Sequence, residues 1–296
     1  MTVKILCDTS ADLNQPNDQT IYDQYNIGTF PMHIIFGTED YRELVDIKTS
    51  EFRKKIYETE VYPTTSQPTQ FDILTQFENY GKEYDEIISF HISSKLSGSY
   101  SNAKIAKRMY EKSNNEHAKV YLIDSLLASS AFGIVVVKAA KMAEKGLSGQ
   151  EIVDEVNKWK KNNIVVYFTV ENLEWLYRGG RLSKTKYYLG SMLNKKPVLT
   201  FVDGEIVSAK TVSGIEKTFD TIIDLAFSRF QGVEQERLMF NLIEFDYKDV
   251  VENVIQKTKN KYPDAKEGKV FEMGGTIASH TGPKTLGFIV SKDFDF

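Results

Sequence analysis

Features that mark several familiar protein classes are scarce or absent in this chain of 296 residues. It has a single cysteine, Cys7, which excludes an intramolecular disulfide framework and fits a reducing compartment. A bilayer span needs about 20 apolar residues. The longest apolar run, near 131–137, is far shorter. No basic segment followed by an apolar stretch opens the chain, so we expect no signal peptide and a cytoplasmic protein.

An excess of one charge sign is also lacking. Lys and Arg number 37 against 41 Asp and Glu, so no basic field favours nucleic acid or an anionic membrane. With four His, no Cys pair and no His-x-x-x-His, the chain shows no metal-binding pattern. It also lacks Gly-x-x-x-x-Gly-Lys-Ser/Thr and Gly-x-Gly-x-x-Gly, so nothing predicts a nucleotide site or another cofactor.

What the first half does contain is a recurring pattern of short apolar segments, each followed by small polar residues and a helical pattern. Val3–Cys7, Ile87–Ile92 and Val120–Ile123 are typical of strands, and Ala131–Lys145 of a helix. This alternation favours an α/β domain in which helices flank a parallel sheet. Ligands of such domains bind at the carboxyl ends of the strands.

The second half has the pattern of an α+β domain with a largely antiparallel sheet. Its strongest signal is a hairpin over Pro197–Ser208 that turns at Asp203-Gly204. We therefore expect two domains, 1–160 and 161–296, with a soft boundary and a segment 60–80 that can pack with either. The other predicted elements are a strand at Ile164–Val170, a helix at Leu173–Arg178, a strand at Arg237–Phe245, a helix at Lys248–Lys261 and two strands within Lys269–Val290.

The most informative segment is the hydroxyl-rich loop Ser93–Ser99, which lies between a predicted strand and a predicted helix. Backbone N–H groups and the positive end of the helix dipole converge at such a place. Ser97 or Ser99 can act simply as the helix cap, the usual role of serine there. The same groups can also bind a carboxylate or a phosphate, and the missing nucleotide motifs favour the carboxylate.

Two further polar segments accompany this loop. Tyr62–Pro68 places hydroxyl groups between two prolines, and Pro68 suits the first position of a helix over Thr69–Tyr80. A rigid, capped connection explains this segment equally well. His280 is expected in a loop of small residues, Ser279–Pro283, where an imidazole can donate to an anion or serve only a structural role.

These residues also permit a different class of function. Ser97 as nucleophile and His280 as base, oriented by Asp8 or Asp124, would form a set able to hydrolyse acyl esters. The Gly-x-Ser-x-Gly elbow of many such enzymes is absent around Ser97. A serine hydrolase therefore stands as the alternative to a binding protein.

In their order along the chain, these motifs resemble the DegV family of bacterial fatty-acid-binding proteins, the acyl-carrying subunits of fatty acid kinase. The resemblance extends over essentially the whole chain, and its most specific part is the pairing of Thr64–Pro68 with Ser93–Tyr100. The segments that carry it are Asp8–Leu13, Tyr62–Pro68, Ile92–Tyr100, Asp124-Ser125, Arg178–Ser183, Lys196–Leu199 and His280–Gly287.

The resemblance implies a two-domain protein that holds a long-chain fatty acid in a tunnel between its domains. It carries the carboxylate contacts over to Thr65 and Ser97, with His280 as a helper. Candidate supporting positions are Thr64, Ser66, Gly98 and Arg181.

The resemblance also implies a carrier that is not itself an enzyme and is expected to be a monomer. A separate ATP-binding kinase subunit would phosphorylate the bound carboxylate to an acyl phosphate. Members that dock the kinase often carry an Arg shortly after a Lys beyond the hairpin. Here Val212 stands in that place after Lys210, which weakens the expectation of a kinase partner and leaves lipid binding intact.

Overall fold

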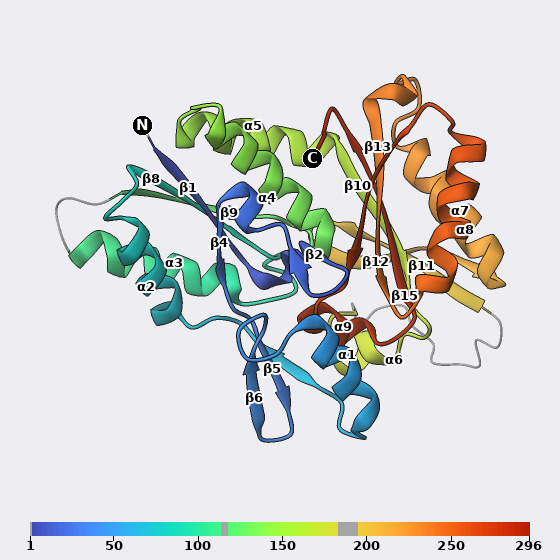
Figure 1. Ribbon diagram of the computed structural model, residues 1–296, viewed down its shortest axis with the longest axis horizontal. Coiled ribbons are helices and arrows are strands. Elements are labelled where there is room, and N and C mark those ends of the chain that lie inside the picture. The colour runs from blue at the N-terminus through green and yellow to red at the C-terminus, as the bar shows by residue number, and fades with distance from the viewer. Residues whose placement is uncertain (1, 114–117, 183–194) are drawn as a thin grey trace. The chain divides into compact units, whose positions relative to one another are not determined.

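The structure, a computed structural model, describes residues 2–113, 118–182 and 195–296 (Figure 1). The chain divides into two compact units, Met1–Asn162 with Gly274–Ile277 and Asn163–Met273 with Ala278–Phe296. Each unit has its own sheet and its own hydrophobic core. Within the described ranges, no helix combines the length and the apolar character needed to cross a bilayer.

The first unit is built on a four-stranded sheet in the order β4-β1-β8-β9. All of its pairings are parallel, as the sequence pattern predicted. Every side chain of β8 is buried, as expected for an inner strand covered on both faces. The sequence pattern did not reveal β4. The strands are β1 (Val3–Asp8), β4 (Ile27–Phe30), β8 (Glu86–His91) and β9 (Lys119–Asp124).

Two pairs of helices cover this sheet, α2 with α3 on one face and α4 with α5 on the other (Figure 1). The core under α2 and α3 joins Leu6, Phe30, Phe77 and Tyr110. Each such side chain stabilises the fold by about 1.5–3 kcal/mol on burial. This core places the start of α3 at the carboxyl ends of β1 and β8. The helices are α2 (Gln70–Tyr80), α3 (Ser99–Ser113), α4 (Ser129–Glu144) and α5 (Gly149–Asn162).

Smaller elements complete the first unit and correct two details of the sequence analysis. Thr64–Ser66 forms a strand, β7, because β5 supplies an antiparallel partner that aligns Ile34 with Thr65. Pro68 is not the first residue of a helix, since α2 is capped by Thr69, whose side chain accepts the Asp72 N–H at 3.2 Å. The remaining elements are β2 (Asn14–Gln15), β3 (Gln19–Thr20), β5 (His33–Phe36), β6 (Glu39–Arg42) and α1 (Thr49–Glu58).

The second unit contains a six-stranded sheet in the order β12-β11-β10-β15-β13-β14. Only β13 and β14 pair in parallel, so the predicted, largely antiparallel sheet is confirmed. Helices α7 (Ile215–Ser228) and α8 (Lys248–Lys261) lie on one face (Figure 1). The strands are β10 (Ile164–Thr169), β11 (Lys195–Val202), β12 (Glu205–Ser213), β13 (Leu238–Phe245), β14 (Lys266–Glu272) and β15 (Thr285–Lys292).

Two local sequence signals from the second half of the chain have different outcomes in the structure. The hairpin turn at Asp203-Gly204 is confirmed, with φ of +49° and +85°, the backbone that favours such a pair. The prediction of a loop around His280 is wrong, because Gly275–Thr281 forms the helix α9. Its first turn is fixed by a distant partner, since the Thr276 N–H donates to Glu43 at 2.9 Å. A local pattern cannot reveal such a contact.

Candidate functional site

The loop that carries Ser97 is a tight structure at the start of α3. The carbonyl of Ser93 accepts the N–H groups of Leu96 and Ser97 at 2.9 and 3.1 Å. The Ser97 hydroxyl oxygen accepts the N–H of Ser99 at 3.2 Å, so the predicted capping role is confirmed. Ser97 is half-buried, and its hydroxyl hydrogen has no acceptor in the described part of the chain. It is therefore available to a ligand.

The segment that carries Thr65 lies against this loop. A Cβ at Gly98 would lie 2.9 Å from the Gln67 Nε2, so the missing side chain lets Gln67 pack over the loop. Asn102 in α3 donates to the Pro68 carbonyl at 2.8 Å. The structure thus brings together two hydroxyl-rich segments that are about 30 residues apart in the sequence.

Beneath the loop lies a buried carboxylate. Asp8 has no exposed surface and accepts hydrogen bonds from the Ser10 hydroxyl, the Ile92 N–H at 3.0 Å and the Ser99 hydroxyl at 2.9 Å. Burial raises the pKa of Asp8 to about 6, although the three donors and their hydrogen bonds oppose the shift. His91 belongs to the same network, since its Nδ1 lies 2.8 Å from the Ser99 Oγ. The sequence did not identify it as a site residue. A polar residue at the end of an apolar strand was its only signal.

The other two predicted site residues, His280 and Arg181, meet in the second unit. A Cβ at Gly179 would lie 2.3 Å from the His280 Nδ1, so only glycine fits there. Arg181 donates to the Gly179 carbonyl and holds this turn, which follows α6 (Glu174–Arg178). Burial and the Arg181 charge lower the pKa of His280 to about 4. The imidazole is therefore neutral at pH 7. Ser183, the last residue of this motif, lies outside the described residues.

The carboxylates considered as orienters for a serine hydrolase are engaged elsewhere. Asp8 holds the network described above. The Asp124 carboxylate accepts the N–H groups of Ser94 and Leu126, both at 3.1 Å. Both carboxylates thus stabilise backbone turns of the first unit.

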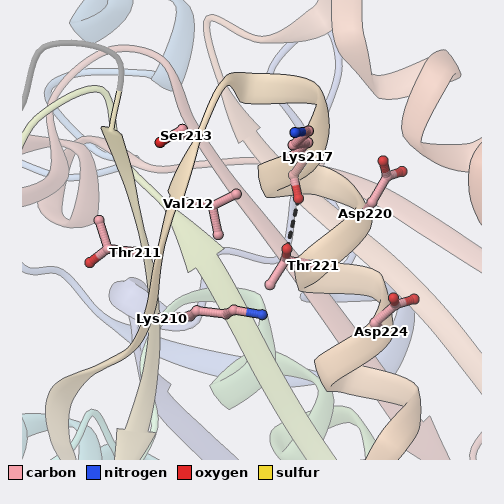
Figure 2. A pocket seen from close by; sticks show the side chains of 8 residues that line it. All are labelled: Lys210, Thr211, Val212, Ser213, Lys217, Asp220, Thr221 and Asp224. Atoms are coloured by element: carbon pink, nitrogen blue, oxygen red, sulfur yellow. Dashed lines mark hydrogen bonds between the residues drawn. The ribbon is translucent and has the colours of Figure 1, made fainter.

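A separate groove lies between β12 and α7 in the second unit and encloses about 440 Å³. Lys210 and Val212 point from β12 towards α7, whereas Thr211 points away from it (Figure 2). Val212 packs on the core of this unit. The residues that line the groove are Lys210, Thr211, Val212, Ser213, Lys217, Asp220, Thr221 and Asp224.

The acidic side chains of this groove form ion pairs, whereas its two lysines form none among the described residues. Asp220 forms an ion pair with Lys257 of α8 at 2.7 Å, and Asp224 pairs with Lys261. Lys210 and Lys217 have no ion-pair partner in the ranges that the structure describes. No group of three or more His, Cys, Asp or Glu among the described residues is arranged to hold a metal ion.

Comparisons with known proteins cover nearly the whole chain. Residues 2–293 match the family model described as "Uncharacterised protein, DegV family". A curated relative from Thermotoga maritima, named "Fatty acid-binding protein", is 30% identical over 294 residues, which are 97% of each chain.

Two solved structures are similar over nearly their full length. A DegV family protein from Thermus thermophilus, described for its fatty acid binding, is 29% identical with a TM-score of 0.87 over 99% of this chain and 100% of that one. DegV from Bacillus subtilis, described as a fatty acid binding protein, is 29% identical with a TM-score of 0.84 over 99% of both chains. These names describe binding proteins rather than enzymes.

Proposed function

The chain belongs to the DegV family, and from that premise we propose that it binds a long-chain fatty acid. Relatives named for fatty acid binding cover almost all of the chain at 29–30% identity, which supports the proposal. A binding role also agrees with the described residues, in which a half-buried serine offers a free hydroxyl hydrogen.

The observation that carries the proposal is the meeting of the Thr65 and Ser97 segments at the start of α3. We propose that these two hydroxyl groups donate to the carboxylate of the fatty acid. Hydrogen bonds to a charged acceptor are roughly twice as strong as neutral ones. The N-terminal end of α3 adds a favourable dipole for the negative charge.

We propose His280 as a further ligand of the carboxylate, following the family resemblance. Its low pKa makes it a neutral donor, while Arg181 supplies positive charge close to it. Thr64, Ser66 and Gly98 are proposed as supporting positions. Gly98 has this role because its missing side chain admits that of Gln67.

The acyl tail contributes about 0.8 kcal/mol for each buried CH₂ group before the costs of association. We therefore expect tail burial to dominate affinity, while the head-group contacts set the register of the chain in its site. The tunnel for the tail and the domain limits 1–160 and 161–296 are part of this proposal and rest on the family resemblance.

We further propose that a separate ATP-binding kinase subunit phosphorylates the carboxylate, while this chain acts as a monomeric carrier in the cytoplasm. The groove of the second unit is the candidate docking surface, because Lys210 and Lys217 present two cations there that have no ion-pair partner among the described residues. Val212 contributes to the core instead of adding a third charge. The docking is therefore expected to be weaker than in members with Arg at this position.

Native mass spectrometry of the purified protein, followed by lipid extraction, tests the proposed function most directly. We expect a mass increment that matches one acyl chain, or uptake of added palmitate or oleate. A protein that neither carries nor takes up an acyl chain would disprove the proposal. Turnover of a p-nitrophenyl ester that is lost in Ser97→Ala would instead indicate the serine hydrolase that uses Ser97 and His280.

A further inference from the structure

A chain of buried hydrogen bonds leads to the Ser97 loop. It begins at Ser89 in β8, passes through the His91 imidazole and the Ser99 hydroxyl, and ends at the Asp8 carboxylate. None of these four side chains has exposed surface. The distances are 2.8 Å from Ser89 Oγ to His91 Nε2, 2.8 Å from His91 Nδ1 to Ser99 Oγ, and 2.9 Å from Ser99 Oγ to Asp8 Oδ2.

The number of hydrogens on each group determines which group donates and which accepts in this series of hydrogen bonds. The Ser99 hydroxyl has one hydrogen and donates it to Asp8. His91 must therefore donate from Nδ1 to the Ser99 oxygen. Burial lowers the pKa of His91 to about 3, so the ring is neutral and holds one N–H. The bare Nε2 then accepts the hydroxyl hydrogen of Ser89.

The backbone of Ser99 connects this chain to Ser97. The Ser99 N–H donates to the Ser97 oxygen at 3.2 Å, so the hydroxyl hydrogen of Ser97 cannot point that way. Two hydrogen bonds hold the side chain of the residue that makes this contact. The hydroxyl of Ser97 therefore has its oxygen occupied as an acceptor, which favours donation of its hydrogen to a ligand. Such preorganisation reduces the entropic cost of binding.

Further contacts restrain the residues of this hydrogen-bond network. The His91 ring stacks on Phe30 at 5.7 Å between centroids and 11° between planes. Asp8 also accepts the N–H of Ile92, which joins the ends of β1 and β8. These contacts leave the imidazole little freedom to rotate.

We propose that Asp8, His91 and Ser99 are positioning residues, which hold Ser97 as a hydrogen-bond donor to the carboxylate of the ligand. This inference rests on the proposed fatty acid function and deepens it. A site that offers a fixed donor selects an ionised acid over its methyl ester. The ratio of the two affinities is therefore a readout that a purely structural role would not change.

The test is a double-mutant cycle that joins Ser99→Ala with Ser97→Ala, with palmitate and methyl palmitate as ligands at pH 7.5. We expect each single variant to weaken palmitate binding by about tenfold, as for the loss of one donor to a charge, and to lower the acid-to-ester ratio. In the Ser97→Ala background, Ser99→Ala should change the affinity by less than about twofold, because the two act through one hydroxyl.

Ser130→Ala is the matched control, since Ser130 is an equally buried serine of the same unit that donates to the Asp12 carbonyl at 2.7 Å. It should leave the acid-to-ester ratio unchanged. Equal losses from Ser99→Ala in both backgrounds, or an unchanged ratio, would overturn the positioning role. Failure of the wild-type protein to bind palmitate at all would instead overturn the proposed function, and the positioning role with it.

A measurement on the wild-type protein covers the case in which Ser99→Ala does not fold. Nitrogen-15 NMR of labelled histidine should show His91 as the neutral Nδ1–H tautomer at pH 7.5. The Nε2–H tautomer, or a charged ring, would contradict the direction of the chain and overturn the inference.

Discussion

Two polar regions of the protein differ in burial and in how their polar groups are paired. The loop around Ser97 rests on a buried network, and each of its hydrogen bonds below the surface is made inside the first unit. The groove around Lys210 and Lys217 is open, and its two cations have no ion-pair partner in the described residues. The first arrangement suits a small head group that must be aligned, whereas the second suits a partner drawn by charge.

Their carboxylates show the physical basis of this contrast. Asp8 is fully buried beside a neutral His91, and burial raises its pKa to about 6. Asp220 in the groove is half exposed and lies 2.7 Å from Lys257. Solvent screens the exposed pair, while the buried carboxylate depends entirely on the hydrogen bonds that the fold provides.

The largest effect is expected from removing the buried charge with Asp8→Asn. Because the folded pKa is raised, the folded state keeps a proton that the unfolded state has lost, and stability falls as pH rises from about 4 to about 6. Asp8→Asn should remove the share of this decline that falls between pH 4.5 and pH 7, about 2 kcal/mol, as urea unfolding at these two pH values can show. Similar slopes in the wild-type protein and in Asp8→Asn would contradict the contrast.

The next effect concerns the head group. Thr65→Ala and Ser97→Ala should each weaken fatty acid binding by about 1–3 kcal/mol, because a charged group loses a donor. Displacement titration with a fluorescent fatty acid measures the loss. Thr211→Ala removes a comparable hydroxyl in the groove and should leave the affinity unchanged. Equal affinities in all three variants would mean that the head group binds elsewhere.

His280 should show a pH dependence opposite in sign to that of Asp8. Its pKa is lowered to about 4, so the unfolded state binds the proton more readily and stability falls as pH drops from about 6.5 towards 4. An NMR titration should place the imidazole midpoint near pH 4. Arg181→Gln removes the second cause of the shift and should raise the midpoint. A midpoint close to 6.5 in the wild-type protein would show that the ring is solvated.

The smallest effect on lipid affinity is expected from the groove. Lys210→Glu with Lys217→Glu should change fatty acid binding by less than about twofold, since exposed charges are screened at physiological salt. The same variant should weaken association with a kinase subunit and reduce its salt dependence, as surface plasmon resonance at two salt concentrations can test. Lys82→Glu, an exposed lysine of the first unit, is the matched control. Unchanged kinase association would exclude this groove as the docking surface.

Elements with strong local signals could be predicted from the sequence. The strand before Ser93, the helix after it and the hairpin at Asp203-Gly204 follow apolar periodicity and turn chemistry, which are properties of neighbouring residues. The capping role of Ser97 is likewise local, since its partner is Ser99. The motifs around Thr65 and His280 were recognised, but the strand that holds one and the helix that holds the other were not.

By itself, the sequence determined which residues carry hydroxyl, imidazole and carboxylate groups and which segments have a regular period. Only the tertiary structure decided that Gln67 lies over Gly98, that Asp8 receives Ser99, and that Glu43 fixes the first turn of α9. Gln67 and Gly98 are 31 positions apart in the sequence, Asp8 and Ser99 are 91 apart, and Glu43 and Thr276 are 233 apart. The reason is physical: a local pattern reports burial along one element, whereas a buried polar contact depends on where two elements meet.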